Sequence, residues 1–313
     1  MNIISKTLRK VCSIKRNLQE WKKRERHYSY GSENLDKTFY VISYDYDTQG
    51  LFAIVKSVLS HIMYAVDNGW IPVVDLKNHK SQYKQGDENT WELFFEQPGG
   101  FSLTDIEKSH NIIKSYYGMY PNNTYDFYVD ILDYPSKYER ISKIYKEYIR
   151  PNAKTLSVMD RRMKNLEIDN KTLGVLCRGT DYLLRKPHNH PRQPQPETVI
   201  HDAKKFIEEH RYDKIFVATE DAEILNLFVR EFGEKLKYID QPRIELAKDK
   251  QYISDIELSA DGRFEIALNY YSALYILSNC TAIIAGRTAG TLGAVFMSEG
   301  YRYSHFYNLG YYD

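Results

Sequence analysis

The stretch Lys171–Tyr182, with the sequence KTLGVLCRGTDY, decides the fold of this chain. Its apolar run Leu173–Cys177 predicts a buried strand, and the polar group Arg178-Gly179-Thr180-Asp181 follows at once. Two later apolar runs end in the same way, at Thr219-Glu220-Asp221 and at Gly286-Arg287-Thr288. In open α/β sheets, ligands bind just outside the carboxyl ends of the strands. We therefore expect these polar strand ends to form one shared site for an anionic ligand.

The composition is that of a folded globular chain. Hydrophobic residues make up 42% and charged residues 27% of its 313 residues, which suits a protein of two ordinary domains. The net charge of +1 does not indicate a nucleic-acid partner. The three cysteines show neither metal-ligand spacing nor a disulfide framework. No apolar run is long enough for a membrane span, and the N-terminus lacks a signal-peptide pattern. We expect a cytoplasmic protein.

The N-terminal segment differs from the rest of the chain in its charge. Residues 1–27 hold nine Lys or Arg and two Glu. Apolar residues recur there at steps of three or four, namely Ile4, Leu8, Val11, Ile14, Leu18 and Trp21. This spacing predicts an amphipathic helix over residues 3–26. One interpretation is peripheral attachment to the anionic inner face of a membrane. The other is a solvated basic helix that packs on the body or on a partner.

The first half of the chain contains a predicted βαβ unit. Thr38–Tyr44 and Trp70–Leu76 are rich in β-branched and aromatic residues and predict strands, and Leu51–Val66 between them predicts an apolar helix. This spacing indicates a parallel sheet. The loop Asp45–Gly50 has the position of a turn that covers a ligand, although it also suits a simple helix entry. Ser136–Leu166 predicts one long helix or two broken helices.

The second half alternates strictly between strands and helices. Predicted strands are Leu173–Cys177, Lys214–Ala218, Leu236–Ile239, Thr281–Ala285 and Tyr303–Leu309. Predicted helices are Glu197–His210, Ala222–Phe232, Arg263–Ser278 and a short one that ends at Met297. The whole pattern predicts two α/β lobes with a cleft between them, which is the usual place for a ligand site.

Arg178 is the first candidate for chemistry. A strand-end guanidinium is always charged, and its fork matches phosphate oxygens, so it can neutralise a diphosphate leaving group. Gly179 lets the backbone turn and approach a ligand closely. Asp181 can orient Arg178 or accept a hydrogen bond from a hydroxyl. The alternative is a structural Arg–Asp clamp at the end of the strand.

The segment after the strand Thr281–Ala285 is the second candidate. A strand that leads into a helix N-terminus presents backbone N–H groups and the positive end of a helix dipole, which together attract an anion. Hydroxyl donors can come from Thr288 and Thr291. The alternative is tight helix packing that requires Gly290 and Gly293. The candidate donor-binding residues of this segment are Arg287, Thr288, Ala289, Gly290 and Thr291.

Two further groups are weaker candidates. Thr219, Glu220 and Asp221 follow a strand, where a carboxylate can accept hydrogen bonds from a base or a sugar hydroxyl. The favoured interpretation of Asp221 is the N-cap of the helix that begins at Ala222. His188 and His190 lie in a proline-rich loop after Arg178 and suit a general base or a diphosphate contact, although most loop histidines are only solvated.

These residues carry a family resemblance. CRGTDY, FVATED and AGRTAGT resemble the three motifs of the GDP-fucosyltransferase superfamily, which includes core α1,6-, α1,2- and protein O-fucosyltransferases and the rhizobial nodulation fucosyltransferase. The segment Thr48–Leu76, TQGLFAIVKSVLSHIMYAVDNGWIPVVDL, is similar to the glycine loop, helix and strand of their first lobe. The family often has His-x-Arg-Arg where this chain has Leu176-Cys177-Arg178-Gly179, so the resemblance indicates a divergent, bacterial-type member.

The resemblance implies a GT-B fold with two Rossmann-like lobes facing a central cleft. The expected division is a basic amphipathic helix over residues 1–30, an acceptor-side lobe over 31–165 and a donor lobe over 166–313. The implied activity is inverting transfer of fucose from GDP-fucose to a glycan hydroxyl, without a cofactor or a required metal. A surface polysaccharide, a glycoconjugate or a lipid-linked glycan is the expected acceptor. The alternatives are another GT-B enzyme, with a different donor or epimerase activity, and a non-catalytic glycan- or nucleotide-binding protein.

The resemblance also assigns roles to single residues. Arg178 would hold the β-phosphate, and Asp221 would pair with the guanine edge. The diphosphate would be lined by Thr288, Ala289 and Gly290, and Gly50 would belong to the glycine loop of the first lobe. The general base remains open, and the candidates are Asp181, His190, Asp45 and Asp47.

Overall fold

The computed structural model of this chain describes residues 25–44, 50–115, 118–243 and 259–313. Of the helix predicted over residues 3–26, only the last two residues are described, and Arg26 begins a strand. Asp45 and Asp47 also lie outside the described residues. The described chain divides into two compact units, with bounds Met1–Asp47 and Ser57–Asp126 for the first, and Thr48–Lys56 and Phe127–Asp313 for the second. The predicted functional division at residues 30 and 165 stays a prediction.

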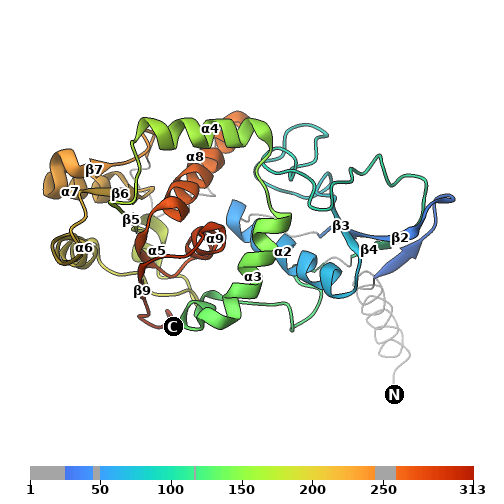
Figure 1. Cartoon of the computed structure of the whole chain (residues 1–313), viewed down its shortest axis with the longest axis horizontal. Helices are drawn as coiled ribbons and strands as arrows, with labels where there is room; N and C mark the ends of the chain where they lie inside the picture. Colours follow the sequence, from blue (N-terminus) through green and yellow to red (C-terminus); the bar gives the residue numbers. More distant parts are fainter. Residues whose placement is uncertain (1–24, 45–49, 116–117, 244–258) are drawn as a thin grey trace, which may run out of the picture. The chain divides into compact units, whose positions relative to one another are not determined.

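The first unit is built on a four-stranded sheet (Figure 1). Its strands, in the order β1-β4-β2-β3, are β1 (Arg26–Tyr28), β4 (Ser109–Lys114), β2 (Glu33–Ile42) and β3 (Ile71–Val74). β2 pairs in parallel with both β3 and β4, while β1 is antiparallel to β4. The helix α2 (Leu51–Asp67) connects β2 to β3 and confirms the predicted βαβ unit. The sequence did not indicate β1 or β4, because both are short and contain several polar residues.

Side chains cover the edge of β3. Asn89 donates to the carbonyl of Val74 at 2.7 Å and accepts from the amide of Leu76 at 3.0 Å. Gln97 accepts from the amide of Val74 at 2.8 Å. These side chains take the place of a neighbouring strand and satisfy the amide and carbonyl of Val74 and the amide of Leu76. Trp91, which is buried and stacked on Phe95, anchors the same segment.

The second unit contains a fully parallel five-stranded sheet in the order β7-β6-β5-β8-β9. Its strands are β5 (Thr172–Leu176), β6 (Lys214–Ala218), β7 (Leu236–Lys237), β8 (Ala282–Gly286) and β9 (Tyr303–Tyr307). β5 and β8 are buried along their whole length. Continuous apolar runs of this kind are typical of parallel strands covered by helices on both faces, and the predicted strands are confirmed here.

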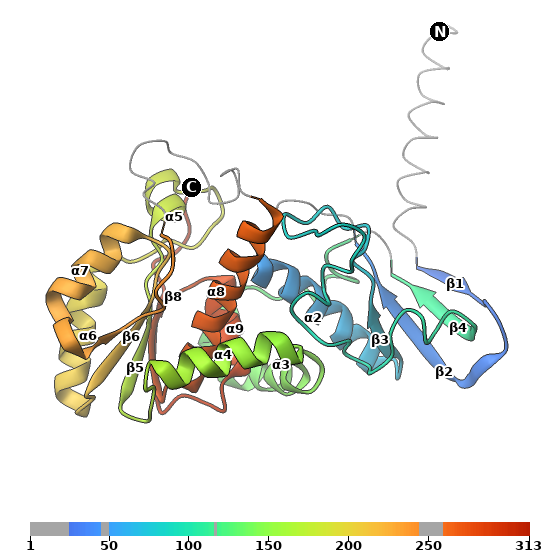
Figure 2. The same ribbon diagram turned by 90° about the horizontal axis from the view of Figure 1, so that it is seen from above.

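Helices cover both faces of this sheet, with α6 and α7 on one face and α8 and α9 on the other (Figure 2). Their bounds are α6 (Pro196–His210), α7 (Ala222–Phe232), α8 (Ala260–Asn279) and α9 (Ala289–Met297). The predicted break in the preceding helical region is confirmed by α3 (Pro135–Tyr148) and α4 (Ala153–Asn165). The short helices are η1 (Val129–Asp133), α5 (Thr180–Arg185) and η2 (Gly233–Lys235). The sequence did not indicate α5.

Buried polar bonds hold α4 on α8. The guanidinium of Arg162 donates to the hydroxyl of Ser272 at 2.7 Å and to the side-chain oxygen of Asn269. On the other face, Val199 and Phe228 pack against Val175 in a continuous core. Both layers therefore fix the strands whose ends carry the predicted motifs. None of the helices in the described part of the chain has the length and hydropathy that a membrane span requires.

Candidate functional site

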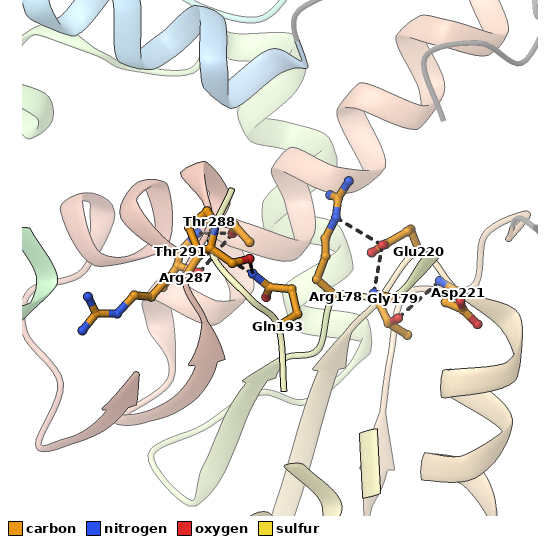
Figure 3. A network of polar contacts seen from close by, with 10 residues as sticks. Arg178, Gly179, Gln193, Glu220, Asp221, Arg287, Thr288 and Thr291 are labelled. Carbon is orange, nitrogen blue, oxygen red and sulfur yellow. Dashed lines mark hydrogen bonds and ion pairs between the residues drawn. The ribbon is translucent and has the colours of Figure 1, made fainter. Parts of the chain in front are cut away.

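The three predicted strand ends lie next to one another. β6, β5 and β8 are consecutive neighbours in the sheet and run in parallel, with Leu176 in register with Ala218 and Ala285. Their carboxyl ends therefore meet at one edge of the second unit. Topology thus brings together the segments that carry Arg178, Glu220 and Thr288 (Figure 3).

One carboxylate joins the ends of β5 and β6. Glu220 Oε1 lies 3.2 Å from Arg178 Nε and accepts a hydrogen bond from the backbone amide of Gly179 at 3.1 Å. The side chains of Arg178 and Glu220 are 18% and 17% exposed. The ring of Tyr182 lies 5.1 Å from Arg178 Cζ and adds a cation–π contact. The sequence named Glu220 within its motif but did not identify it as the partner of Arg178.

The packing around position 179 leaves no room for a side chain. A Cβ at this position would lie 2.5 Å from the side chain of Ile224 and 2.8 Å from Asp221 Oδ2. Its φ of −117° lies on the side of the Ramachandran plot that other residues also adopt. The absence of a side chain therefore lets the end of β5 approach the start of α7.

Asp221 caps α7. Its Oδ1 accepts hydrogen bonds from the amides of Glu223 and Ile224, at 2.9 and 3.1 Å. The amide of Asp221 itself donates to the hydroxyl of Thr219 at 3.2 Å. These bonds confirm the N-cap interpretation, and the pairing of Asp221 with a guanine edge stays a prediction.

Thr288 has the same role at α9. Its hydroxyl accepts a hydrogen bond from the amide of Thr291 at 3.1 Å, and the hydroxyl of Thr291 donates to the carbonyl of Gly286. Both threonines are buried, and Ala289 and Gly290 form the first turn of the helix. These buried hydrogen bonds stabilise the turn between β8 and α9. The positive end of the α9 dipole lies at the same sheet edge as Arg178.

Tyr270, on α8, contacts this turn. A Cβ built on Gly290 would lie 2.0 Å from the Tyr270 hydroxyl oxygen, so the glycine makes room for the phenol. Burial raises the pKa of Tyr270 to about 12, and the positive charge of Arg178 partly opposes this rise. Tyr270 is therefore a neutral hydroxyl near both Arg178 and the first turn of α9. The sequence missed it because its position depends on how α8 packs.

Arg287 points away from Arg178 (Figure 3). Its guanidinium forms ion pairs with Asp130, at 3.3 Å, and with Asp133, both in η1. The side chain is 3% exposed. These carboxylates hold the charge of Arg287 at the junction of β8 with η1. The predicted contact of Arg287 with a donor stays a prediction.

Gln193 supports the β8–α9 turn from the other side. Its Nε2 donates to the carbonyls of Arg287 and Pro191, each at 3.1 Å. A Cβ on Gly286 would lie 2.0 Å from Gln193 Oε1, so the amide fills the space that this glycine leaves. The sequence gave no signal for Gln193, which lies in the loop between α5 and α6.

The remaining predicted residues lie at different places. Asp181 is part of α5, but its side chain is outside the described part of the structure. His190 is exposed, and its ring lies 5.7 Å from that of Tyr182, which in turn contacts Arg178. Gly50, in the second unit, accepts hydrogen bonds from the amides at the start of α2. His190 is thus linked to Arg178 through the ring of Tyr182.

A cavity of about 720 Å³ lies beside this edge of the sheet. Gln193 lines it, together with Lys186, Arg192 and Tyr307. Arg178 and Thr288 do not line it, so the cavity and the candidate site are adjacent but different places. Within the described residues, no cluster of three or more His, Cys, Asp or Glu could hold a metal ion.

Comparisons with known proteins bear on the fold. No protein-family model and no curated protein sequence matches this chain. POFUT1 in complex with GDP matches with a TM-score of 0.53 at 10% identity, over 87% of this chain and 99% of that chain. NodZ α-1,6-fucosyltransferase co-crystallized with GDP matches with a TM-score of 0.51 at 14% identity, over 84% of this chain and 93% of that chain. NodZ is a fucosyltransferase from Bradyrhizobium.

A further structure, POFUT1 in complex with GDP-fucose, matches with a TM-score of 0.52 at 9% identity, over 88% of this chain and 98% of that chain. At these identities, the likeness shows the fold. The chain has a GDP-fucosyltransferase-like fold, and its mixed α/β structure with parallel sheets fits a GT-B-like architecture.

Proposed function

We propose that this chain is an inverting glycosyltransferase that uses a nucleotide-sugar donor, with GDP-fucose as the first candidate. The observation that carries the proposal is the meeting of Arg178 with the N-terminus of α9 at neighbouring ends of parallel strands. A guanidinium and a helix dipole at one edge suit a diphosphate. The same fold occurs in proteins whose structures contain GDP or GDP-fucose.

In the proposed reaction, an acceptor hydroxyl attacks the anomeric carbon of the sugar. The bond from that carbon to the diphosphate oxygen breaks, and the diphosphate leaves with the electron pair. Arg178 and the α9 N-terminus stabilise the developing charge, and one such group commonly contributes about 3–4 kcal/mol. The candidates to receive the hydroxyl proton are Asp181 and His190, with Asp45 and Asp47 as further candidates.

The rest of the assignment is part of the same proposal. The lobe over residues 31–165 binds the acceptor, and the lobe over residues 166–313 binds the donor. The acceptor is a glycan of a surface polysaccharide or glycoconjugate, including the lipid-linked form. Residues 3–26 bind the inner face of an anionic membrane, and the reaction needs no metal.

The test is a donor panel with the intact protein. Thermal-shift and calorimetric titrations with GDP, UDP and dTDP identify the nucleotide, and release of GDP from GDP-fucose in the presence of glycan acceptors identifies the reaction. We expect binding of GDP, and transfer that persists in EDTA. Preference for UDP or dTDP points to another GT-B enzyme. Binding of GDP without turnover over a broad acceptor panel points to a non-catalytic protein.

A further inference from the structure

We propose that Glu220 is a positioning residue of the donor site, which holds the Arg178 guanidinium and the Gly179 amide in the arrangement that binds the diphosphate. This inference rests on the proposed function and adds to it a residue that the family resemblance did not assign. Glu220 acts through Arg178 and does not itself contact the donor.

The geometry comes from a single oxygen atom. Glu220 Oε1 lies 3.2 Å from Arg178 Nε and 3.1 Å from the Gly179 amide nitrogen. Glu220 follows β6 and the other two residues follow β5, so the interaction spans two strand ends. The ion pair uses the Nε side of the guanidinium, and its terminal nitrogens point away from Glu220 (Figure 3).

Two contacts bear on the orientation of Arg178. The carboxylate of Glu220 forms an ion pair 3.2 Å from Nε, and the ring of Tyr182 lies 5.1 Å from Cζ. A planar guanidinium held in this way loses little rotational freedom when it binds a phosphate group, because its fork is already aligned. Without Glu220, the side chain of Arg178 would lose one of the groups that order it before the ligand binds.

The neighbours of Glu220 have roles of their own. Asp221 Oδ1 caps α7, and the hydroxyl of Thr219 accepts a hydrogen bond from the Asp221 amide. Glu220 is the member of this strand end whose carboxylate pairs with Arg178.

The same carboxylate also opposes anion binding. Glu220 is 17% exposed, so its negative charge is screened less than it would be in bulk water and repels a nearby diphosphate. Glu220 should therefore weaken the binding of free GDP while it aligns Arg178 for the transition state. A clamp with a structural role alone would not affect these two quantities in opposite directions.

The variant Glu220→Gln separates the two effects. Its amide oxygen can still accept from the Gly179 amide, so the strand ends remain joined, but the charge that holds Arg178 is lost. We expect the Kd for GDP to decrease about threefold and kcat for transfer to fall about tenfold. In an Arg178→Ala background, Glu220→Gln should change kcat by less than about twofold, because the group that it positions is absent.

Glu223→Gln is the matched control. Glu223 is exposed in the first turn of α7 and carries the same charge close to the site. Both constants should stay within about twofold of those of the wild type. A similar pattern in Glu223→Gln and Glu220→Gln would assign the effect to general charge and overturn the inference.

The remaining outcomes are distinct. A wild type that neither binds a nucleotide nor transfers a sugar overturns the proposed function and, with it, the inference. An active wild type whose Glu220→Gln variant keeps both constants, or loses kcat and GDP affinity together, overturns the inference alone. If Glu220→Gln does not fold, Glu220→Asp keeps the charge but shortens the side chain. We expect a lower kcat without a gain in GDP affinity, and an unchanged kcat contradicts the proposal.

Discussion

Arg178 and Arg287 follow neighbouring parallel strands of one sheet, yet their surroundings differ. Arg178 pairs with Glu220 through Nε and is 18% exposed, with its terminal nitrogens directed away from that carboxylate. Arg287 pairs with Asp130 and Asp133 and is 3% exposed. An arginine at a strand end is therefore not by itself evidence of a ligand site. Its carboxylate partners and its exposure separate an anion-binding arginine from one that joins structural elements.

The largest expected effect is on turnover. Arg178→Ala removes the cation that stabilises the leaving diphosphate, so kcat should fall by roughly two to three orders of magnitude. The melting temperature should change little, because the side chain and its ion pair with Glu220 are partly exposed. Steady-state transfer assays and thermal unfolding measure the two quantities. Activity close to that of the wild type would remove Arg178 from the mechanism.

The second prediction concerns Arg287, where we expect the main loss in stability and not in turnover. Arg287→Ala removes a buried guanidinium, so Asp130 and Asp133 lose their cationic partner and keep the hydrogen bonds from Tyr311 and Asn308. Asp130 and Asp133 are 55% and 44% exposed, so water solvates them in part. We expect a loss of about 2–3 kcal/mol in the free energy of unfolding, below the range for a fully buried pair. Urea unfolding measures it, and a loss under about 0.5 kcal/mol, typical of a surface change, would show that the contrast with Arg178 is wrong.

The third prediction concerns the packing of Tyr270 against the first turn of α9. Gly290→Ala places a Cβ 2.0 Å from the Tyr270 hydroxyl and should destabilise the chain by about 1–2 kcal/mol. Tyr270→Phe removes that oxygen but leaves Cζ at 2.9 Å, so the double variant should recover part of the loss. A double-mutant cycle in urea measures the recovery. Purely additive effects would mean that Tyr270 and Gly290 do not interact.

The smallest expected effect separates two roles of Asp221. Asp221→Ala removes the α7 cap and should cost about 1 kcal/mol, whereas Asp221→Asn keeps a capping oxygen and should cost less than about 0.5 kcal/mol. If Asp221 also pairs with guanine, Asp221→Asn lowers the affinity for GDP at least about tenfold despite its normal stability. Calorimetric titration with GDP decides this, and an unchanged affinity limits Asp221 to the cap.

Local patterns predicted much of the second unit. The bounds of β6 and α7 and the capping role of Asp221 follow from an apolar run that ends in capping chemistry. The parallel order of the sheet follows from the strict alternation of strands and helices. These features depend on residues that are close in sequence, where propensity and periodicity act directly.

Contacts between distant residues could not be predicted in this way. Arg287 finds its carboxylates 157 and 154 positions earlier, in a five-residue 3₁₀ helix that no periodicity indicates. Glu220 reaches Arg178 across 42 positions only because β5 and β6 are paired in register. Tyr270 contacts Gly290 because of the way in which α8 packs on α9. Each contact depends on tertiary packing, which a single sequence does not display.

The central claim is that the ends of β5 and β8 bind one diphosphate together, and a crystal structure of this protein with GDP tests it most directly. We predict the β-phosphate within hydrogen-bonding distance of the Arg178 guanidinium and of the backbone amides at Ala289 and Gly290, with Glu220 still paired to Arg178. GDP bound in the neighbouring cavity beside Gln193 and Arg192, with Arg178 and the α9 turn out of contact with phosphate, would contradict the account.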